Sequence, residues 1–398
     1  MSSIVDVLTR LGLPNRVPAE VLADPYAALL PTPITFDPFF EDPADPADPA
    51  DGPYPTDAPG TVLRSREITG LVPRPRTRLR QFAVASRDAQ SRPVTVTASL
   101  MEPRRPWRGP GPRPVLVHNV AIDSLGSAAT PSYRLVHGLG QDFPAVVPLW
   151  LQRGYAVLIV DHEGPRMAYA EGTMAGHAVL DGLRGLPSLD ATYRDSPAVM
   201  YGYSGGAIAT VWAAQLQPSY APELPLIGAI AGGTPTNVGL LRETMNGTIA
   251  SGLFGAAVIG LAREHEALAD EFGPLGLYLA TRIKNLSVVP LALGGLARLP
   301  LEALARDPNV FDSPVARAVI DANTPGAAAP TVPFAFYHGA RDRWIPEHGV
   351  RTLADDWRAH DADVEVRRVV GDHFVGAVSG LPFVTRWVAE RFTDSTRR

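Results

Sequence analysis

The stretch Ala198-Val199-Met200-Tyr201-Gly202-Tyr203-Ser204-Gly205-Gly206-Ala207 decides the fold of this chain. An apolar run ends in Gly-x-Ser-x-Gly, and a small-residue helical pattern over 208–214 follows directly. A strand, a sharp turn and a helix in this order form the elbow that lifts a nucleophilic serine above a sheet. The two outer glycines fit positions where strand and helix approach too closely for a side chain. The pattern therefore predicts a nucleophilic Ser204, with the Gly205 N–H at a helix N-terminus; an incidental serine in a glycine-rich turn is the alternative.

Length and composition describe a large globular protein. The 398 residues are 45% hydrophobic and carry a net charge of −5 without a basic block, so we expect no nucleic-acid partner. There is no cysteine, which excludes disulfides, thiolate metal sites and a cysteine nucleophile. The start, residues 1–6, lacks a positive segment, so we expect no signal peptide in this chain. Composition leaves the compartment and the oligomeric state open.

The first sixty residues are rich in proline and aspartate and contain an Asp-Pro-Ala repeat within 41–51. We expect the repeat to be an exposed extended segment, because its aspartates lack the ligand spacing of a calcium loop. Phe36, Phe39 and Phe40 stand just before it, around a turn-forming Asp-Pro. A membrane anchor is the alternative, but so many neighbouring aspartates favour burial against the protein body. We therefore expect these rings to hold the arm in place.

Apolar segments of two kinds predict the sheet. Residues 81–85 and 94–100 alternate with period two and are separated by polar residues, which is typical of an antiparallel hairpin. Apolar runs that alternate with helical patterns follow at 115–117, 155–160, 198–200, 226–230, 334–336 and 364–366. Mostly continuous apolar strands separated by helices indicate a parallel sheet that is buried on both faces. We predict an α/β fold with a mostly parallel sheet flanked by helices.

Residues between Gly233 and Pro330 break this alternation with glycine-interrupted apolar segments. The gap is too long for an ordinary crossover, so we predict a mostly helical insertion. We expect it to cap the serine; a packed subdomain without a role at the site is the alternative. Candidates to line an acyl tunnel, with core packing as the alternative, are Leu253, Phe254 and Ile259. The expected divisions are an N-terminal arm 1–60, a first core part 61–235, the cap insertion 236–330 and a second core part 331–398.

A serine hydroxyl becomes a good nucleophile only beside a base, and the base needs an orienting carboxylate. In this fold the chain order is serine, acid, histidine. Asp342 stands in a loop after the strand at 334–336, and His373 follows the last strand. Loops at the carboxyl ends of parallel strands meet at one edge, where the elbow also lies. We predict a catalytic triad of Ser204, Asp342 and His373, with Asp372 as the alternative acid.

The other histidines fit the role of the base less well. Four precede the serine and violate the order: His118, His137, His162 and His177. The remaining four are His265 in the insertion, His348 and His360 in polar helical surroundings, and His338 at a strand end where a packed structural role is expected. The triplet Asp161-His162-Glu163 lacks the helical two-histidine spacing of a zinc site, so we interpret it as a buried structural network. We expect no metal and no cofactor.

Five motifs stand in a fixed order along the chain: Asp161-His162-Glu163-Gly164, Leu180-Asp181-Gly182, Gly202-Tyr203-Ser204-Gly205-Gly206-Ala207, Ser219-Tyr220-Ala221-Pro222-Glu223-Leu224 and Gly232-Gly233-Thr234-Pro235. Together they resemble the secretory lipase family, the lipases related to Candida antarctica lipase A. The resemblance runs from about residue 30 to the C-terminus. It implies an α/β-hydrolase fold with a helical cap, and it assigns the same triad.

The resemblance also implies an oxyanion hole. The family's oxyanion loop is similar to Ala121-Ile122-Asp123-Ser124, which pairs Asp123 with the Gly205 N–H; fungal members read Tyr-Glu-Asp where this chain has Ala121-Ile122-Asp123. The implied activity is hydrolysis of carboxylic esters, foremost of acylglycerols, with a lipid–water interface as a candidate partner and no cofactor. A short-chain esterase, an acyltransferase or a catalytically silent binding protein of the same fold are the alternatives. Family members are often secreted.

Overall fold

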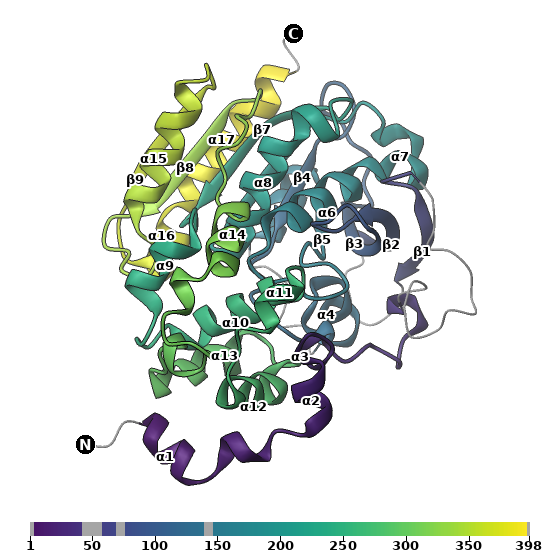
Figure 1. Ribbon diagram of the computed structural model, residues 1–398. Helices are drawn as coiled ribbons and strands as arrows, with labels where there is room; N and C mark the ends of the chain where they lie inside the picture. Colours follow the sequence, from purple (N-terminus) through teal and green to yellow (C-terminus); the bar gives the residue numbers. More distant parts are fainter. Residues whose placement is uncertain (1–3, 42–57, 69–75, 139–145, 396–398) are drawn as a thin grey trace.

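The computed structural model describes residues 4–41, 58–68, 76–138 and 146–395 (Figure 1). Within these residues a nine-stranded sheet runs in the order β1-β2-β3-β5-β4-β6-β7-β8-β9. Its strands are β1 Val62–Ile68, β2 Thr77–Arg87, β3 Pro93–Pro103, β4 Val115–Asn119, β5 Ala156–Val160, β6 Ala198–Tyr203, β7 Leu226–Gly232, β8 Phe334–Gly339 and β9 Val364–Val369. The pairs from β1 to β5 are antiparallel, and those from β5 through β4 to β9 are parallel.

The predicted strands are confirmed. The hairpin of β2 and β3 pairs Phe82 with Ala98, and the apolar runs further along the chain form the parallel strands. The additional strand β1 was not expected from the sequence. It lies at the sheet edge, and its middle four residues are all polar, three of them charged, so it has no long apolar run. A charged edge strand is a common protection against edge-to-edge association.

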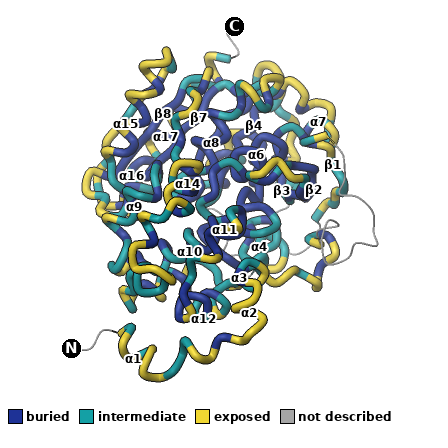
Figure 2. The backbone as a smooth tube through the Cα atoms, viewed as in Figure 1, coloured by how far each residue is buried: buried dark blue, intermediate teal, exposed yellow. Residues whose placement is uncertain are grey.

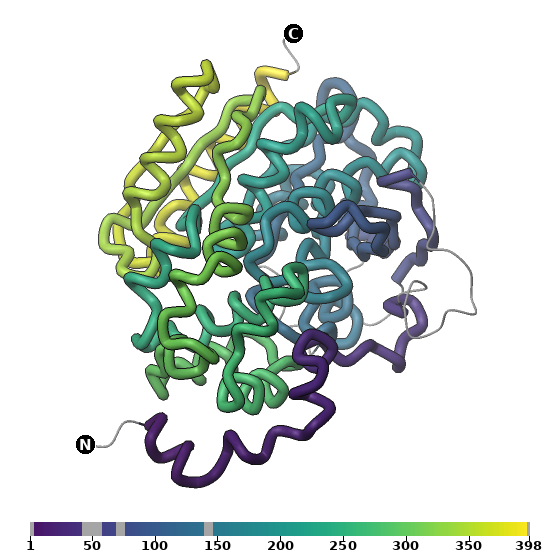
Figure 3. Tube along the Cα trace, viewed as in Figure 1, coloured from purple at the N-terminus to yellow at the C-terminus, as the bar shows by residue number. Residues whose placement is uncertain are grey.

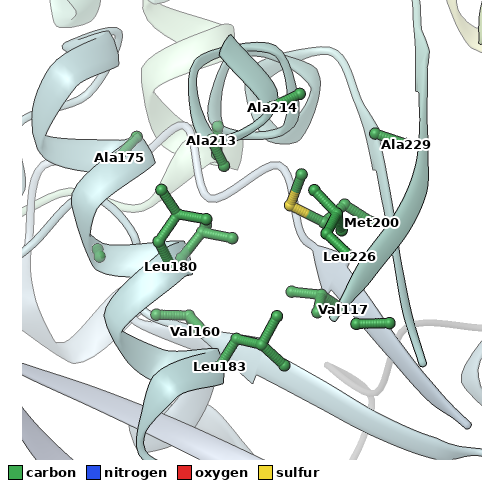
Figure 4. Packing of buried hydrophobic residues seen from close by; sticks show 14 of the residues in the cluster. Val117, Val160, Ala175, Leu180, Leu183, Met200, Ala213, Ala214, Leu226 and Ala229 are labelled. Carbon is green, nitrogen blue, oxygen red and sulfur yellow. The ribbon is translucent and has the colours of Figure 1, made fainter. Parts of the chain in front are cut away.

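Helices cover both faces of the sheet, because successive side chains of each strand point to opposite sides. Val117 and Met200 pack under α6 and α8, as Figure 4 shows for this cluster, whereas Leu116 and Val199 face α5 and α17. The burial map in Figure 2 accordingly shows a dark interior along the strands and α8. The helices outside the insertion are α1 Ile4–Arg10, α2 Ala19–Ala23, α3 Pro25–Leu29, α4 Pro131–His137, α5 Val147–Arg153, α6 Gly172–Arg184, α7 Leu186–Leu189, α8 Gly205–Tyr220, α15 Glu347–Arg358, α16 His373–Ser379 and α17 Leu381–Ser395.

The predicted helical insertion stands between β7 and β8. Its helices are α9 Val238–Met245, α10 Ser251–Ala262, α11 Glu266–Ala269, α12 Pro274–Ile283, α13 Val288–Gly294 and α14 Pro314–Ala322. They lie together at one end of the sheet (Figure 1) and share a second hydrophobic core centred on α10. The exact domain limits stay a prediction. Within the described ranges, no helix combines the length and apolarity that crossing a membrane requires.

The N-terminal arm is partly helical. Its purple trace in Figure 3 runs along the insertion, where α2, α3 and a 3₁₀ turn contact α12. Phe39 is buried and carries the Arg66 guanidinium 4.1 Å above its ring, so this ring does hold the arm. The same expectation is wrong for Phe36, which is 77% exposed although its ring forms a T-shaped pair with His137. Most of the Asp-Pro-Ala repeat lies outside the described residues.

Candidate active site

The serine elbow has the strained backbone that its sequence predicts. Ser204 adopts φ 54° and ψ −122° between β6 and α8, a conformation that residues with a side chain rarely adopt. A Cβ on Gly202 would clash with the Gly206 carbonyl, and one on Gly206 would clash with the Asn119 carbonyl at the end of β4. Both positions therefore require glycine. The tight turn leaves the serine side chain at the carboxyl edge of the sheet.

The structure brings Ser204, Asp342 and His373 together. Asp342 lies in the loop after β8, and His373 is the first residue of α16, which follows β9. The imidazole Nδ1 lies 2.7 Å from Asp342 Oδ2, and Nε2 lies 2.9 Å from Ser204 Oγ. With Nδ1–H donating to the carboxylate, Nε2 is left to accept the serine proton. The Tyr203 hydroxyl also donates to the His373 carbonyl, which fixes the start of α16.

The Asp342 carboxylate is buried and fully engaged. Its Oδ1 accepts hydrogen bonds from the backbone N–H groups of Trp344 (3.0 Å) and Ile345 (2.9 Å). Burial on its own raises the pKa of this carboxyl, but the hydrogen bond and the charge of His373 outweigh it and hold the pKa below the ordinary value. The carboxyl is therefore ionised at neutral pH. It is the arrangement expected of a group that orients an imidazole.

The alternative acid, Asp372, has a different place. Its Oδ1 accepts from the N–H groups of Phe374 (3.0 Å) and Val375 (2.9 Å), so its carboxylate caps the N-terminus of α16. His338, the strand-end histidine, is fully buried behind Asp342, and its Nε2 bonds the Ile345 carbonyl at 2.9 Å. Burial lowers its pKa despite the neighbouring carboxylate. His338 is thus a packed neutral histidine.

The Asp161-His162-Glu163 triplet forms a buried network at the end of β5. Asp161 accepts hydrogen bonds from the Thr97 hydroxyl and from the Ser132 N–H, and the His162 ring bonds the Val120 carbonyl. These hydrogen bonds join neighbouring segments, which gives the Asp161 and His162 side chains a structural role. Among the residues that the structure describes, no group of three or more His, Cys, Asp or Glu side chains is arranged to hold a metal ion.

Asp123 lies against the first residue of α8. It has a positive φ of 48°, and its Oδ1 is so close to Gly205 that a Cβ there would clash with it. This buried oxygen has no hydrogen-bond partner among the described residues. Burial raises the pKa of the Asp123 carboxyl to about 6, although a charge on His373 opposes the shift. Gly205 opens the helix, so its N–H has no intrahelical acceptor.

Glu163 lies beside the same loop. Burial, and after it the Asp123 charge, raise the pKa of the Glu163 carboxyl well above the ordinary value, although the neighbouring backbone of Asp123 and Ser124 opposes the shift. The side chain of Asp123 is what faces Gly205. Sequence reasoning assigned Glu163 to a structural network, and only the motif containing it signalled a link to the site.

A cavity of about 450 Å³ opens above the serine. Ser204, His373 and Asp123 form its polar part, and helices of the insertion supply most of its apolar walls. Of the three candidate tunnel residues, Leu253 and Phe254 line this cavity. Ile259 lines a separate apolar cavity on the other side of α10, of about 110 Å³. The site therefore places a hydrogen-bonded serine, histidine and aspartate beneath a largely apolar cavity.

Comparison with known proteins agrees with this geometry. The family model described as secretory lipase matches residues 138–397. The chain belongs to the secretory lipase family. The lipases of this family are serine ester hydrolases, and membership places this chain in that enzyme class. Lipase 4 of Candida albicans is 30% identical to this chain. The aligned region covers 94% of this chain and 84% of Lipase 4.

Two further known proteins, one sequence relative and one solved structure, align with nearly the whole of this chain. A relative from Mycobacterium tuberculosis, named probable inactive lipase MT1628, is 28% identical over 95% of this chain and 86% of its own length. The crystal structure of Candida antarctica lipase A in its closed state superposes with a TM-score of 0.81 at 26% identity, covering 91% of this chain and 86% of that one. The α/β-hydrolase fold with its helical insertion is thus shared with a solved lipase.

Proposed function

We propose that this protein hydrolyses carboxylic esters, foremost acylglycerols, through an acyl-enzyme on Ser204. One observation carries the proposal: an unbroken hydrogen-bond relay from Ser204 Oγ to His373 Nε2 (2.9 Å) and from Nδ1 to Asp342 Oδ2 (2.7 Å), at the floor of an apolar cavity. Such a relay activates a hydroxyl that is otherwise a poor nucleophile. The Asp342 carboxylate, ionised at neutral pH, would stabilise the imidazolium that forms.

In the first half-reaction, Ser204 Oγ bonds to the ester carbonyl carbon while its proton moves to His373 Nε2. The tetrahedral intermediate then collapses: the bond to the alcohol oxygen breaks, and the imidazolium returns its proton to the leaving alcohol. In the second half-reaction, water gives its proton to His373 and attacks the acyl carbon. Collapse releases the carboxylic acid and restores the serine hydroxyl. An alcohol in place of water would give acyl transfer by the same steps.

The negative oxygen of each tetrahedral intermediate needs hydrogen-bond donors. We propose that the Gly205 N–H supplies one and the neutral Asp123 carboxyl supplies the other. One observation supports Asp123: its Oδ1 is buried beside Gly205 and has no hydrogen-bond partner among the described residues. A carboxyl that donates must be protonated, and burial favours that form. Asp123 would thus act through its side chain.

The apolar surroundings favour long acyl chains and a lipid–water interface. Walls from α10 and α13 continue from the cavity to an apolar rim. At this rim Leu293, Leu296 and Phe374 are each at least 60% exposed. Exposed apolar side chains gathered at a cavity mouth are typical of a surface that meets a partner. The proposal is therefore a lipase; a short-chain esterase would use the same triad with a shorter cavity.

A catalytically silent protein is the second candidate, because one relative is named a probable inactive lipase. An assay of the hydrolysis of p-nitrophenyl esters from acetate to palmitate distinguishes the two candidates. We expect wild-type activity that extends to long chains and is lost in Ser204→Ala but kept in the control Ser219→Ala, whose hydroxyl bonds only the Leu216 carbonyl at the surface. Activity on short chains alone would contradict a lipase. Equal rates in wild type and Ser204→Ala would contradict the whole proposal.

A further inference from the structure

Arg263, at the C-terminal end of α10, is fully buried although it is charged. Its guanidinium donates hydrogen bonds to five backbone carbonyls from four separate segments. They are Leu29 (2.9 Å), Leu125 (2.8 Å), Arg166 (3.0 Å), Met167 (3.1 Å) and Lys284 (2.8 Å). Burying a guanidinium is costly unless its donors are satisfied, and here carbonyl oxygens satisfy them. Arg263 therefore joins the arm, the oxyanion loop, the segment after β5 and the insertion at one point.

The loop that carries Asp123, residues 122–126, lies directly on the insertion segment 284–288. Leu125 N–H donates to the Leu286 carbonyl at 2.9 Å, and Val288 N–H donates to Ser124 Oγ at 3.0 Å. The two backbones are so close at Gly126 that an added Cβ would clash with the Asn285 carbonyl. The insertion thus contacts this loop from Ser124 to Gly126.

Such support matters because Asp123 has a φ of 48°. A residue with a side chain keeps a positive φ only where its surroundings over-determine it. The hydrogen bonds with the 284–288 segment and the Arg263 bond to the Leu125 carbonyl do so here. Without them the loop could relax, and the Asp123 carboxyl would leave its place beside Gly205.

We propose that Arg263 and the 284–288 segment are positioning elements of the oxyanion hole, so that the cap insertion sets the geometry of catalysis as well as the shape of the cavity. The inference rests on the proposed function, in which Asp123 donates to the tetrahedral oxygen. Neither Arg263 nor the segment touches the reacting atoms. They act on the reaction through the loop. They should change the rate of the chemical step and not substrate binding, because the oxyanion forms only during the reaction.

The sharpest variant is Gly126→Ala. It places one methyl group between the loop and the Asn285 carbonyl, removes no charge, and is compatible with the backbone, since the φ of Gly126 is −97°. A displacement of about 1 Å in a catalytic group costs on the order of 10²-fold in rate. We expect kcat for p-nitrophenyl butyrate to fall by about 10- to 100-fold, with KM within two-fold of wild type. Arg263→Met should have the same effect, and Arg263→Lys, which keeps three donors, a smaller one.

A second readout separates positioning from damage to the substrate pocket. A short-chain trifluoromethyl ketone adds to Ser204 Oγ and forms an anionic oxygen in the oxyanion hole, whereas the corresponding alcohol binds the cavity without one. In Gly126→Ala we expect affinity for the ketone to fall by the same factor as kcat/KM, and affinity for the alcohol to stay unchanged. Equal losses for both ligands would overturn the proposal.

A control uses the same region. Gly294→Ala adds the same methyl group at the end of α13, where no atom lies within 4 Å, and it should keep wild-type kcat. Where Arg263→Met does not fold, Gly126→Ala and Ser124→Ala, which removes only the hydroxyl bonded to Val288 N–H and the Ile122 carbonyl, decide the outcome. Wild-type kcat in both would overturn this inference alone, whereas activity in Ser204→Ala would overturn the proposed function.

Discussion

Asp342 and Asp372 both stand near His373, and their surroundings give them different tasks. Asp342 bonds the imidazole, whereas Asp372 caps α16. Replacing Asp342 by Asn should lower kcat by roughly 10³- to 10⁴-fold with little change in fold, because the amide would favour the wrong imidazole tautomer. Asp372→Asn removes a similar charge and should keep kcat within a few-fold. Steady-state hydrolysis of p-nitrophenyl butyrate compares them, and a larger loss in Asp372→Asn would contradict the assignment of the acid.

Asp123 should make the activity fall as pH rises through about 6. Its pKa is raised to about 6, so the neutral form that can donate to an oxyanion is lost as pH rises through that value. Asp123→Asn keeps an N–H donor that does not titrate, so its profile should lack this decline. Asp123→Leu has no donor and should lose about 10²- to 10³-fold in kcat. An unchanged decline around pH 6 in Asp123→Asn would exclude this carboxyl as its cause.

At the scale of elements, α10 separates two apolar cavities. Ala257 faces the cavity above Ser204, and its neighbour Val258 faces the other. Ala257→Leu should therefore fill the first cavity and lower kcat/KM for palmitate at least ten-fold, because the added side chain competes with a long acyl chain for the same space. The butyrate value should stay within two-fold.

Val258→Leu is the matched control on the adjacent position and should change neither value. Thermal unfolding of both variants reports whether the helix is intact. Equal losses for butyrate and palmitate in Ala257→Leu would show that this cavity does not hold the acyl chain.

Elements with continuous apolar runs could be predicted from the sequence, and the parallel strands β4 to β9 are the example. β1 could not, because an edge strand needs no apolar run, and its seven residues include Arg64, Arg66 and Glu67. The short helices α1 to α3 were missed for another reason. They are largely exposed, and α2 and α3 are stabilised by contacts with α12 and, for α3, with Arg263 where local propensity is weak.

The same contrast holds for the site. Ser204, Asp342 and His373 each follow a recognisable strand, so the fold's topology suggested that they meet. Asp123 came only from the family resemblance, because its loop has no periodic pattern. The contacts of Arg263 could not be foreseen at all, since its partners are backbone carbonyls from segments as distant in sequence as residues 29 and 284. Such contacts depend on the tertiary fold and leave no mark in the residue types.

At the scale of the whole molecule, the apolar rim should bind a lipid–water interface. Leu296, at the cavity mouth, is 71% exposed, and Val378, one turn after Phe374 on α16, is 67% exposed. Leu296→Asp combined with Val378→Asp should lower adsorption to a tributyrin emulsion about 100-fold, since each apolar side chain contributes on the order of 1.5 kcal/mol when buried. Hydrolysis of dissolved p-nitrophenyl acetate should be unaffected.

Leu22→Asp provides the control for that pair, because Leu22 is 50% exposed on α2 and does not line the cavity. It should adsorb and hydrolyse as the wild type does. Equal adsorption of the rim variant and this control would show that the protein meets lipid through another face.

The central claim is that Ser204 carries the acyl group, and mass spectrometry of the reacting enzyme tests it most directly. Rapid mixing with p-nitrophenyl butyrate, acid quenching and peptide mapping should place one butyryl group on Ser204 in the wild type. Ser204→Ala should carry none, and His373→Ala should acylate far more slowly. Ester hydrolysis that leaves Ser204 unmodified, or that continues at the wild-type rate in Ser204→Ala, would contradict the account.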